Sequence, residues 1–145
     1  MNILQVAPYF PPYKGGQEEH VAKLADHLRA NGHTVKVLTS DYPPEETPDE
    51  EPDIHRLTVQ ARLLRNPFVI PQTVILRLFR WADVAHTHNE HAFISNLAAL
   101  AGTYTGTPTV LTAMDSYRSA VYSLTPSNQR TIGPSALTRS KRWIA

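Results

Sequence analysis

The fold class is decided by residues 3–39, which read ILQVAPYFPPYKGGQEEHVAKLADHLRANGHTVKVLT. Residues 3–7 form a short apolar run before a proline-rich loop, a pattern typical of a buried strand. A helical pattern begins at Gln17 and ends at Gly32, with one apolar face made of Val21, Leu24, Ala25 and Leu28. Residues 35–39 are again an apolar run. Strand, helix and strand with such short connections predict a βαβ unit and hence a parallel sheet.

The rest of the chain continues this alternation. Strands are expected at residues 54–59, 83–86 and 109–112, and helices at residues 71–81 and 92–105. The second of these helices carries Phe93, Leu97, Leu100 and Ala101 on one face. The pattern weakens beyond Asp115, and residues 143–145 resemble the start of a strand. We therefore expect one α/β domain over residues 1–145, a Rossmann-like parallel sheet with helices on both faces.

Composition excludes several classes of protein. The chain has 145 residues and no cysteine, so disulfides, thiolate metal sites and cysteine nucleophiles are absent. Residues 1–6 do not resemble a secretory signal, and no apolar run approaches the roughly 20 residues of a membrane span. These features predict a cytoplasmic protein.

The net charge of +1 is unevenly distributed. Of the 13 acidic residues, seven lie between Asp41 and Asp53, a stretch with four prolines and no lysine or arginine. Residues 41–53 are therefore expected to be an acidic, proline-rich surface loop. The rest of the chain carries 14 basic residues against the other six acids, which favours anionic partners: phosphates, nucleic acid or a membrane surface.

A pair of glycines, Gly15 and Gly16, follows the first predicted strand and precedes the first predicted helix. In an open parallel sheet this position borders the ligand crevice, and the start of a helix offers free N–H groups to an anion. The Gly-x-Gly-x-x-Gly and P-loop patterns are both missing. The pair indicates either an anion-binding loop or simply a tight turn entering a helix.

Three histidines, His86, His88 and His91, follow the predicted strand at residues 83–86. Their types suggest a metal site, but a strand end turning into a loop does not require three imidazoles to converge. A loop that binds phosphate or hydroxyl groups, or ordinary hydrogen-bonded packing, fits the pattern as well. Asp115 follows the next parallel strand and would reach the same crevice as a hydrogen-bond acceptor for a sugar or alcohol.

Residues 62–81 combine four arginines with many apolar side chains. This composition fits an interfacial amphipathic helix that contacts a membrane. It fits equally a helix that packs on the core and turns its arginines to solvent.

Four sequence blocks resemble the N-terminal half of a family 4 glycosyltransferase of the two-Rossmann-domain (GT-B) type. They are PPYKGGQEEH at residues 11–20, LADHLRANGHTV at 24–35, DVAHTH at 83–88 and GTPTVLT at 106–112. The resemblance implies transfer of a sugar from a nucleotide sugar to an acceptor hydroxyl with retention of configuration. It implies a nucleotide sugar as co-substrate and no separate cofactor or metal.

The resemblance also assigns residues. It places Gly15 and Gly16 under the donor diphosphate, and it turns the loops at residues 86–91 and 112–115 toward the acceptor and the donor sugar. Met114 stands where the family usually has a histidine, directly before Asp115. A thioether does not move protons, so His88 becomes the candidate replacement and Asp115 the second candidate catalytic residue.

The family continues into a second, donor-binding domain, so the resemblance implies a chain that is truncated before that domain and inactive unless it is completed. The implied partners are a nucleotide sugar, an acceptor glycan or lipid-linked acceptor, and a complementary donor-domain protein. Peripheral contact with an anionic membrane at the inner face of the cell membrane is a further expectation, and nucleic acid is not an expected partner. The alternative is a non-catalytic fragment, or a subunit of a split transferase, that acts as an acceptor- or anion-binding module.

Overall fold

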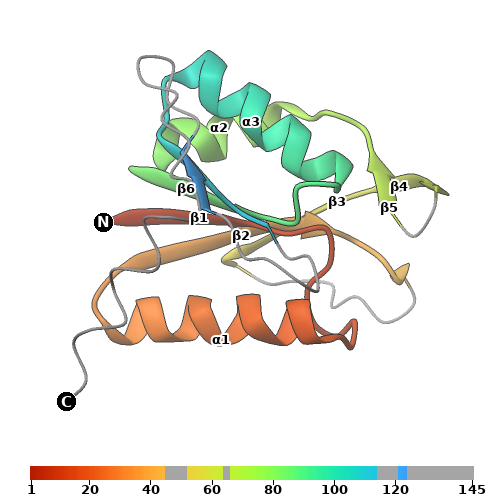
Figure 1. The fold of residues 1–145 in the computed structure, drawn as a ribbon, viewed down its shortest axis with the longest axis horizontal. Coiled ribbons are helices and arrows are strands. Elements are labelled where there is room, and N and C mark those ends of the chain that lie inside the picture. Colours follow the sequence, from red (N-terminus) through yellow and green to blue (C-terminus); the bar gives the residue numbers. More distant parts are fainter. Residues whose placement is uncertain (45–51, 64–65, 114–120, 124–145) are drawn as a thin grey trace, which may run out of the picture.

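A computed structural model describes residues 1–44, 52–63, 66–113 and 121–123. Its main sheet has the strand order β3-β2-β1-β6-β7-β8 (Figure 1). The strands are β1 (Asn2–Val6), β2 (Thr34–Ser40), β3 (Ile54–Leu57), β6 (Val84–His88), β7 (Thr109–Thr112) and β8 (Val121–Ser123). Neighbours from β3 to β7 are parallel, and β8 is antiparallel to β7. The mostly parallel sheet confirms the predicted fold class.

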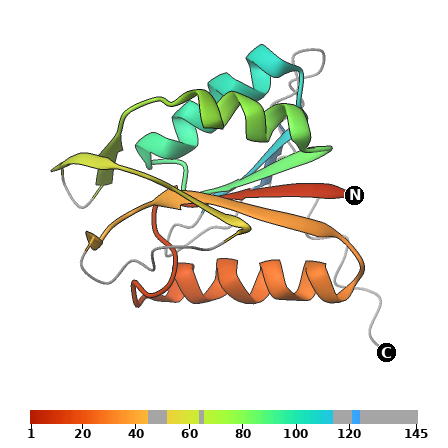
Figure 2. The ribbon, with the colours of Figure 1, turned by 180° about the vertical axis from the view of Figure 1, so that it is seen from behind.

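Helices cover both faces of the sheet, as expected. Helix α1 (Gly16–Ala30) lies on one face, while α2 (Thr73–Trp81) and α3 (Phe93–Thr105) lie together on the other (Figures 1 and 2). Alternation along the strands explains the two layers, because successive side chains point to opposite faces. Leu4 and Val6 of β1 pack under α2 and α3, whereas Ile3 packs with Val21 of α1.

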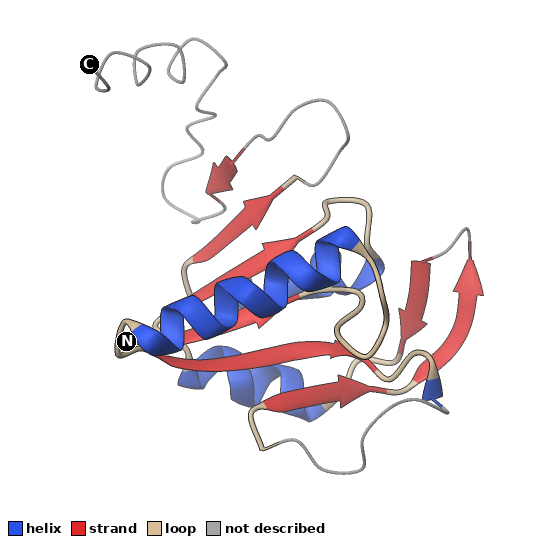
Figure 3. Cartoon of the chain, turned by 90° about the horizontal axis from the view of Figure 1, so that it is seen from below, coloured by secondary structure: helices blue, strands red, loops and turns tan. Residues whose placement is uncertain are grey.

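The basic, apolar region does not form one helix, so that interpretation is wrong for its first part. Strands β4 (Val59–Leu63) and β5 (Asn66–Val69) pair as a separate antiparallel hairpin. Figure 3 shows this hairpin beyond the ends toward which the strands of the main sheet point. Asp41 directs the chain into it, since its carboxylate accepts the Val59 N–H at 2.9 Å. The predicted strand at residues 54–59 therefore ends at Leu57.

Helix α2 is a core-facing helix. Ile75, Leu78 and Phe79 are buried, while Arg77 and Arg80 on the other side are exposed. The core-facing interpretation of the arginines is therefore confirmed for this part of the region.

The predicted face of α3 is partly wrong. Its buried residues are Ile94, Ser95, Ala98, Ala101 and Gly102, whereas Leu100 is 68% exposed. The reason is close packing on β7: a Cβ atom on Gly102 would clash with the Thr109 hydroxyl and lie 3.1 Å from the Thr107 carbonyl oxygen. Small residues let the helix approach the sheet, and this arrangement rotates the larger Leu100 outward.

Some predicted features lie outside the described residues. These are most of the acidic loop, Met114 and Asp115, and the strand expected at residues 143–145. The ends of the acidic loop that are described include Pro52 and Asp53, both exposed. In the part of the chain that the structure describes, no helix combines the length and the apolar character needed to cross a membrane.

Candidate functional site

The glycine loop, residues 7–15, connects β1 to α1 at the carboxyl edge of the sheet. Gly15 is the N-cap residue with extended backbone (φ −174°, ψ 164°), and it supplies no side chain to cap the helix. The Glu19 N–H donates to the Gly15 carbonyl at 3.1 Å. The N–H groups of residues 16–18 come before this first intrahelical hydrogen bond. They are the donors that the start of a helix leaves without an intrahelical partner. With the helix dipole, they make this end attractive to an anion.

The two glycines have different surroundings. A Cβ atom on Gly15 would clash with the carboxylate of Glu18, whereas a Cβ atom on Gly16 would meet no other atom within 4 Å. The backbone at Gly16 is therefore open to a ligand, and the backbone at Gly15 is covered by the protein's own side chain. Of the two glycines, only Gly16 has free space where a side chain would be.

Glu18 is a site residue that the sequence analysis did not single out. It is only 5% exposed and is the third residue of α1, from which a side chain can reach back to the N-cap. The sequence contains a pattern that could have identified Glu18, because a glutamate three residues after an N-cap position is half of a capping box. Its carboxylate lies beside Gly15, and with Glu19 it places two acidic side chains in the first turn of α1.

The start of α1 and the end of β6 meet at this edge. Asn89 follows β6 with φ at 70°, a conformation that asparagine tolerates better than most residues. Its side-chain amide donates to the Gln17 Oε1 at 3.4 Å, and its backbone N–H donates to the Thr112 carbonyl at 3.0 Å. The Gln17 Nε2 is buried and has no hydrogen-bond partner in the described part of the chain. The start of α1 and the loop after His88 are thus joined by a hydrogen bond.

His88 lies inside the protein rather than on its surface. Its side chain is 0% exposed, and its Nε2 is 2.7 Å from the Gln5 Oε1, so Nε2 carries the hydrogen. Burial, with smaller contributions from His86 and His20, lowers the pKa of His88 to about 3. The imidazole is therefore neutral at physiological pH, with a buried Nδ1 that has no partner among the described residues. A catalytic role for His88 stays a prediction.

The other two histidines lie in different environments. His86 is half-buried, with its Nε2 2.8 Å from the Thr112 hydroxyl, and burial lowers its pKa. His91 is exposed, 3.5 Å from Glu90. The His86 and His88 rings lie together with centroids 4.1 Å apart, and the His20 ring is 6.2 Å from that of His88. Within the described ranges, however, no group of three or more histidine or carboxylate side chains could hold a metal ion. Asp115 lies outside these ranges, so its role also stays a prediction.

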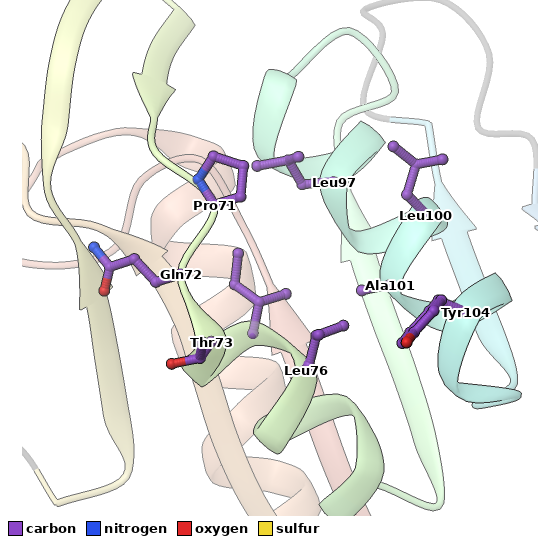
Figure 4. Close-up of a pocket in the computed structure, with 9 residues that line it drawn as sticks. Pro71, Gln72, Thr73, Leu76, Leu97, Leu100, Ala101 and Tyr104 are labelled. Atoms are coloured by element: carbon purple, nitrogen blue, oxygen red, sulfur yellow. The ribbon is translucent and has the colours of Figure 1, made fainter.

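Two hollows lie on opposite faces of the sheet. One, of about 600 Å³, is bounded by the loop residues Pro11–Gly15 and by Glu19, Ala22, Lys23 and Asp26 of α1. The other, of about 400 Å³, is an apolar groove between α2 and α3. Figure 4 shows Leu76 of α2 opposite Leu97, Ala101 and Tyr104 of α3 across this groove. The first hollow borders the glycine loop, and the second lies away from it.

Comparison with protein families matches residues 14–145 to the family described as Glycosyltransferase Family 4. This range contains both glycines, all three helices and the strands from β2 onward. None of the curated proteins compared with the chain matches it. Because the match covers most of the 145 residues, the chain belongs to glycosyltransferase family 4.

Proposed function

We propose that the chain is the acceptor-side domain of a retaining glycosyltransferase, and that the N-terminus of α1 binds the diphosphate of a nucleotide-sugar donor. The observation that supports this most is the open backbone at Gly16, next to the unpaired N–H groups at the start of a 15-residue helix. Membership of the glycosyltransferase family supports a reaction in which this proposed anion site would hold a diphosphate.

The chemistry of sugar transfer explains why such a site is useful. The bond from the sugar to the diphosphate breaks, and negative charge develops on the leaving phosphate oxygen. Fixed N–H donors that face this oxygen stabilise the transition state more than the ground state. The Gln17 Nε2 at the same helix end is buried and without a partner among the described residues, so it would donate to the diphosphate only after its side chain turns outward. In this proposal the nucleotide sugar is the co-substrate, and no separate cofactor is used.

The remaining groups of the cleft are part of the same proposal. Asp115 would accept a hydrogen bond from a sugar hydroxyl, and a second, donor-binding domain would hold the nucleotide. His88 is completely buried, so a direct contact with substrate would require the surrounding chain to open.

A lipid-linked acceptor held at a membrane surface is a second candidate, favoured by the apolar groove. Leu100 and Tyr104, on its α3 side, are 68% and 73% exposed, and Arg80 on α2 is exposed as well. Exposed apolar residues near a cation suit peripheral contact with anionic lipid. Phosphatidylglycerol vesicles should therefore sediment the chain, and Leu100→Gln with Tyr104→Ser should reduce this. If the wild-type chain and this double variant sediment equally with the vesicles, the groove is not the surface that binds lipid.

Calorimetric titration with inorganic pyrophosphate, at fixed ionic strength, tests the anion site. Gly16→Leu places a side chain in the open space and should weaken binding at least tenfold. It should leave the fold intact, because no other atom lies within 4 Å of the new Cβ. Ala30→Leu is the matched control, since it adds the same side chain at the exposed far end of α1. Pyrophosphate affinity that Gly16→Leu does not change would refute the proposed site.

A further inference from the structure

Three tyrosines and one arginine gather next to the glycine loop, and we call them the tyrosine–arginine cluster: Tyr9, Tyr13, Tyr42 and Arg62. Tyr9 and Tyr13 belong to the loop after β1, and their rings stack with centroids 4.4 Å apart and planes at 14°. Tyr42 follows β2, and its ring lies 5.9 Å from Tyr9 and 6.0 Å from Tyr13. The rings thus join two loops at the carboxyl edge of the sheet.

Arg62 approaches this group from the hairpin strand β4. Its guanidinium lies 4.1 Å from the centroid of the Tyr42 ring, and its Nη1 donates to the Tyr42 hydroxyl at 2.6 Å. These partners are neutral phenols, and no carboxylate of the described residues forms an ion pair with Arg62. Arg62 is also exposed. The cluster therefore presents a permanent positive charge that the protein does not neutralise within its described part.

The surface of the cluster suits one kind of ligand. Tyr13 and Tyr42 are half-buried, so each ring keeps an accessible portion, and Tyr13 borders the hollow of about 600 Å³. Flat aromatic rings offer apolar contact area, and a guanidinium binds carboxylate or phosphate groups in a bidentate manner. A pyranose has apolar C–H faces that can lie on such rings. A sugar with an anionic substituent would use both components.

We propose that the tyrosine–arginine cluster is the acceptor site, and that it recognises a hexopyranose carrying a carboxylate or a phosphate. The sugar ring would rest on the face of Tyr13 that is not stacked on Tyr9, and the anionic group would bind Arg62, whose guanidinium lies over the Tyr42 ring. Tyr13 is three residues before Gly16, so a sugar on it lies beside the proposed diphosphate site. The inference rests on the proposed function, because it takes the bound sugar to be the acceptor.

A purely structural role for the cluster, anchoring the hairpin to the glycine loop, makes a different prediction. An anchor needs the Tyr42 contacts but does not distinguish charged from neutral sugars. Ligand charge therefore separates the two roles.

The experiment is a saturation-transfer NMR titration of the 145-residue chain with three probes. Methyl β-D-glucuronide tests the carboxylate, glucose 6-phosphate tests the phosphate, and methyl β-D-glucoside is the neutral reference. We expect at least one anionic sugar to bind tenfold or more tightly than the neutral one. Equal affinities for all three probes, or no binding of any, would overturn the inference.

Variants identify the residues. Arg62→Gln should abolish the preference for the anionic sugar, whereas Arg77→Gln, which removes the same charge from an exposed position of α2, should not. Tyr13→Leu should weaken the binding of every sugar. Tyr13→Phe keeps the aromatic ring and should retain binding, and this variant tests the role of the ring if Tyr13→Leu does not fold. An anionic preference that survives Arg62→Gln contradicts the assignment.

The same variants separate this inference from the proposed function. Gly16→Leu tests the diphosphate site through pyrophosphate affinity, and Arg62→Gln tests the acceptor site through the preference for the anionic sugar. If pyrophosphate binding depends on Gly16 but sugar binding ignores Arg62 and Tyr13, the diphosphate site stands and the acceptor assignment fails.

Discussion

Gly15 and Gly16 differ in the space around their backbone atoms. The space above Gly16 is open, while the neighbouring Gly15 is covered by the carboxylate of Glu18. Two adjacent glycines that look equivalent in the sequence therefore have separate purposes. Gly15 allows a buried glutamate to fold back over the start of α1, and Gly16 leaves the open space that the proposed anion site requires. The capping pattern of residues 15–18 indicates the first purpose, but only the structure reveals the second.

His88 gives a pH-dependent prediction at the residue scale. Its pKa is about 3 in the folded protein and 6.5 in its ordinary state. Between these values the unfolded chain binds a proton that the folded chain does not. The free energy of unfolding should therefore fall as pH is lowered from 6.5, by up to about 1.4 kcal/mol per pH unit from this group.

Urea unfolding from pH 7 to pH 4 measures this slope, and His88→Gln is the comparison because glutamine keeps a donor for Gln5 without titrating. The variant should show a shallower pH dependence than the wild type. His86 and His55 also have lowered pKa values and remain in both proteins, so some slope persists. Identical slopes would mean that His88 is not held neutral by burial.

Helix α3 provides a prediction at the scale of elements. Ala98 is 1% exposed and Leu100 is 68% exposed, although periodicity placed Leu100 with the apolar face. Ala98→Gln should lower the free energy of unfolding by about 2–4 kcal/mol, because it overpacks the interface and buries an amide. Leu100→Gln should change it by less than about 0.5 kcal/mol. Urea unfolding decides, and similar losses in both variants would contradict the observed helix orientation.

The same scale shows what sequence patterns can predict. Apolar patterns identified α1, α2 and α3 and the parallel strands, because each helix buries one continuous face and the strands are short apolar runs. The hairpin was missed although residues 59–63 alternate apolar and polar side chains, because its second strand contains Pro67, which argues against a strand. The tyrosine–arginine cluster could not be predicted either. Its members come from positions 9, 13, 42 and 62, and only the arrangement of two loops and the hairpin brings them together.

At the scale of the whole molecule, the parallel sheet gathers the functional groups at one edge. Its carboxyl ends hold the glycine loop, Asn89 and the loop with Tyr42, in keeping with the general location of ligands in open α/β sheets. The proposed diphosphate site and the proposed acceptor site share this edge. The apolar groove between α2 and α3 lies on a separate face, where lipid contact would not obstruct either site.

The most direct test of the central claim is a residue-resolved NMR titration of the 145-residue chain with inorganic pyrophosphate. The account predicts saturable shifts of the backbone amide signals of Gly16 and Gln17, larger than those of an exposed cation on the other face such as Arg77, and their loss in Gly16→Leu. Shifts confined to exposed basic residues elsewhere, with the amides at the start of α1 unchanged, would contradict it.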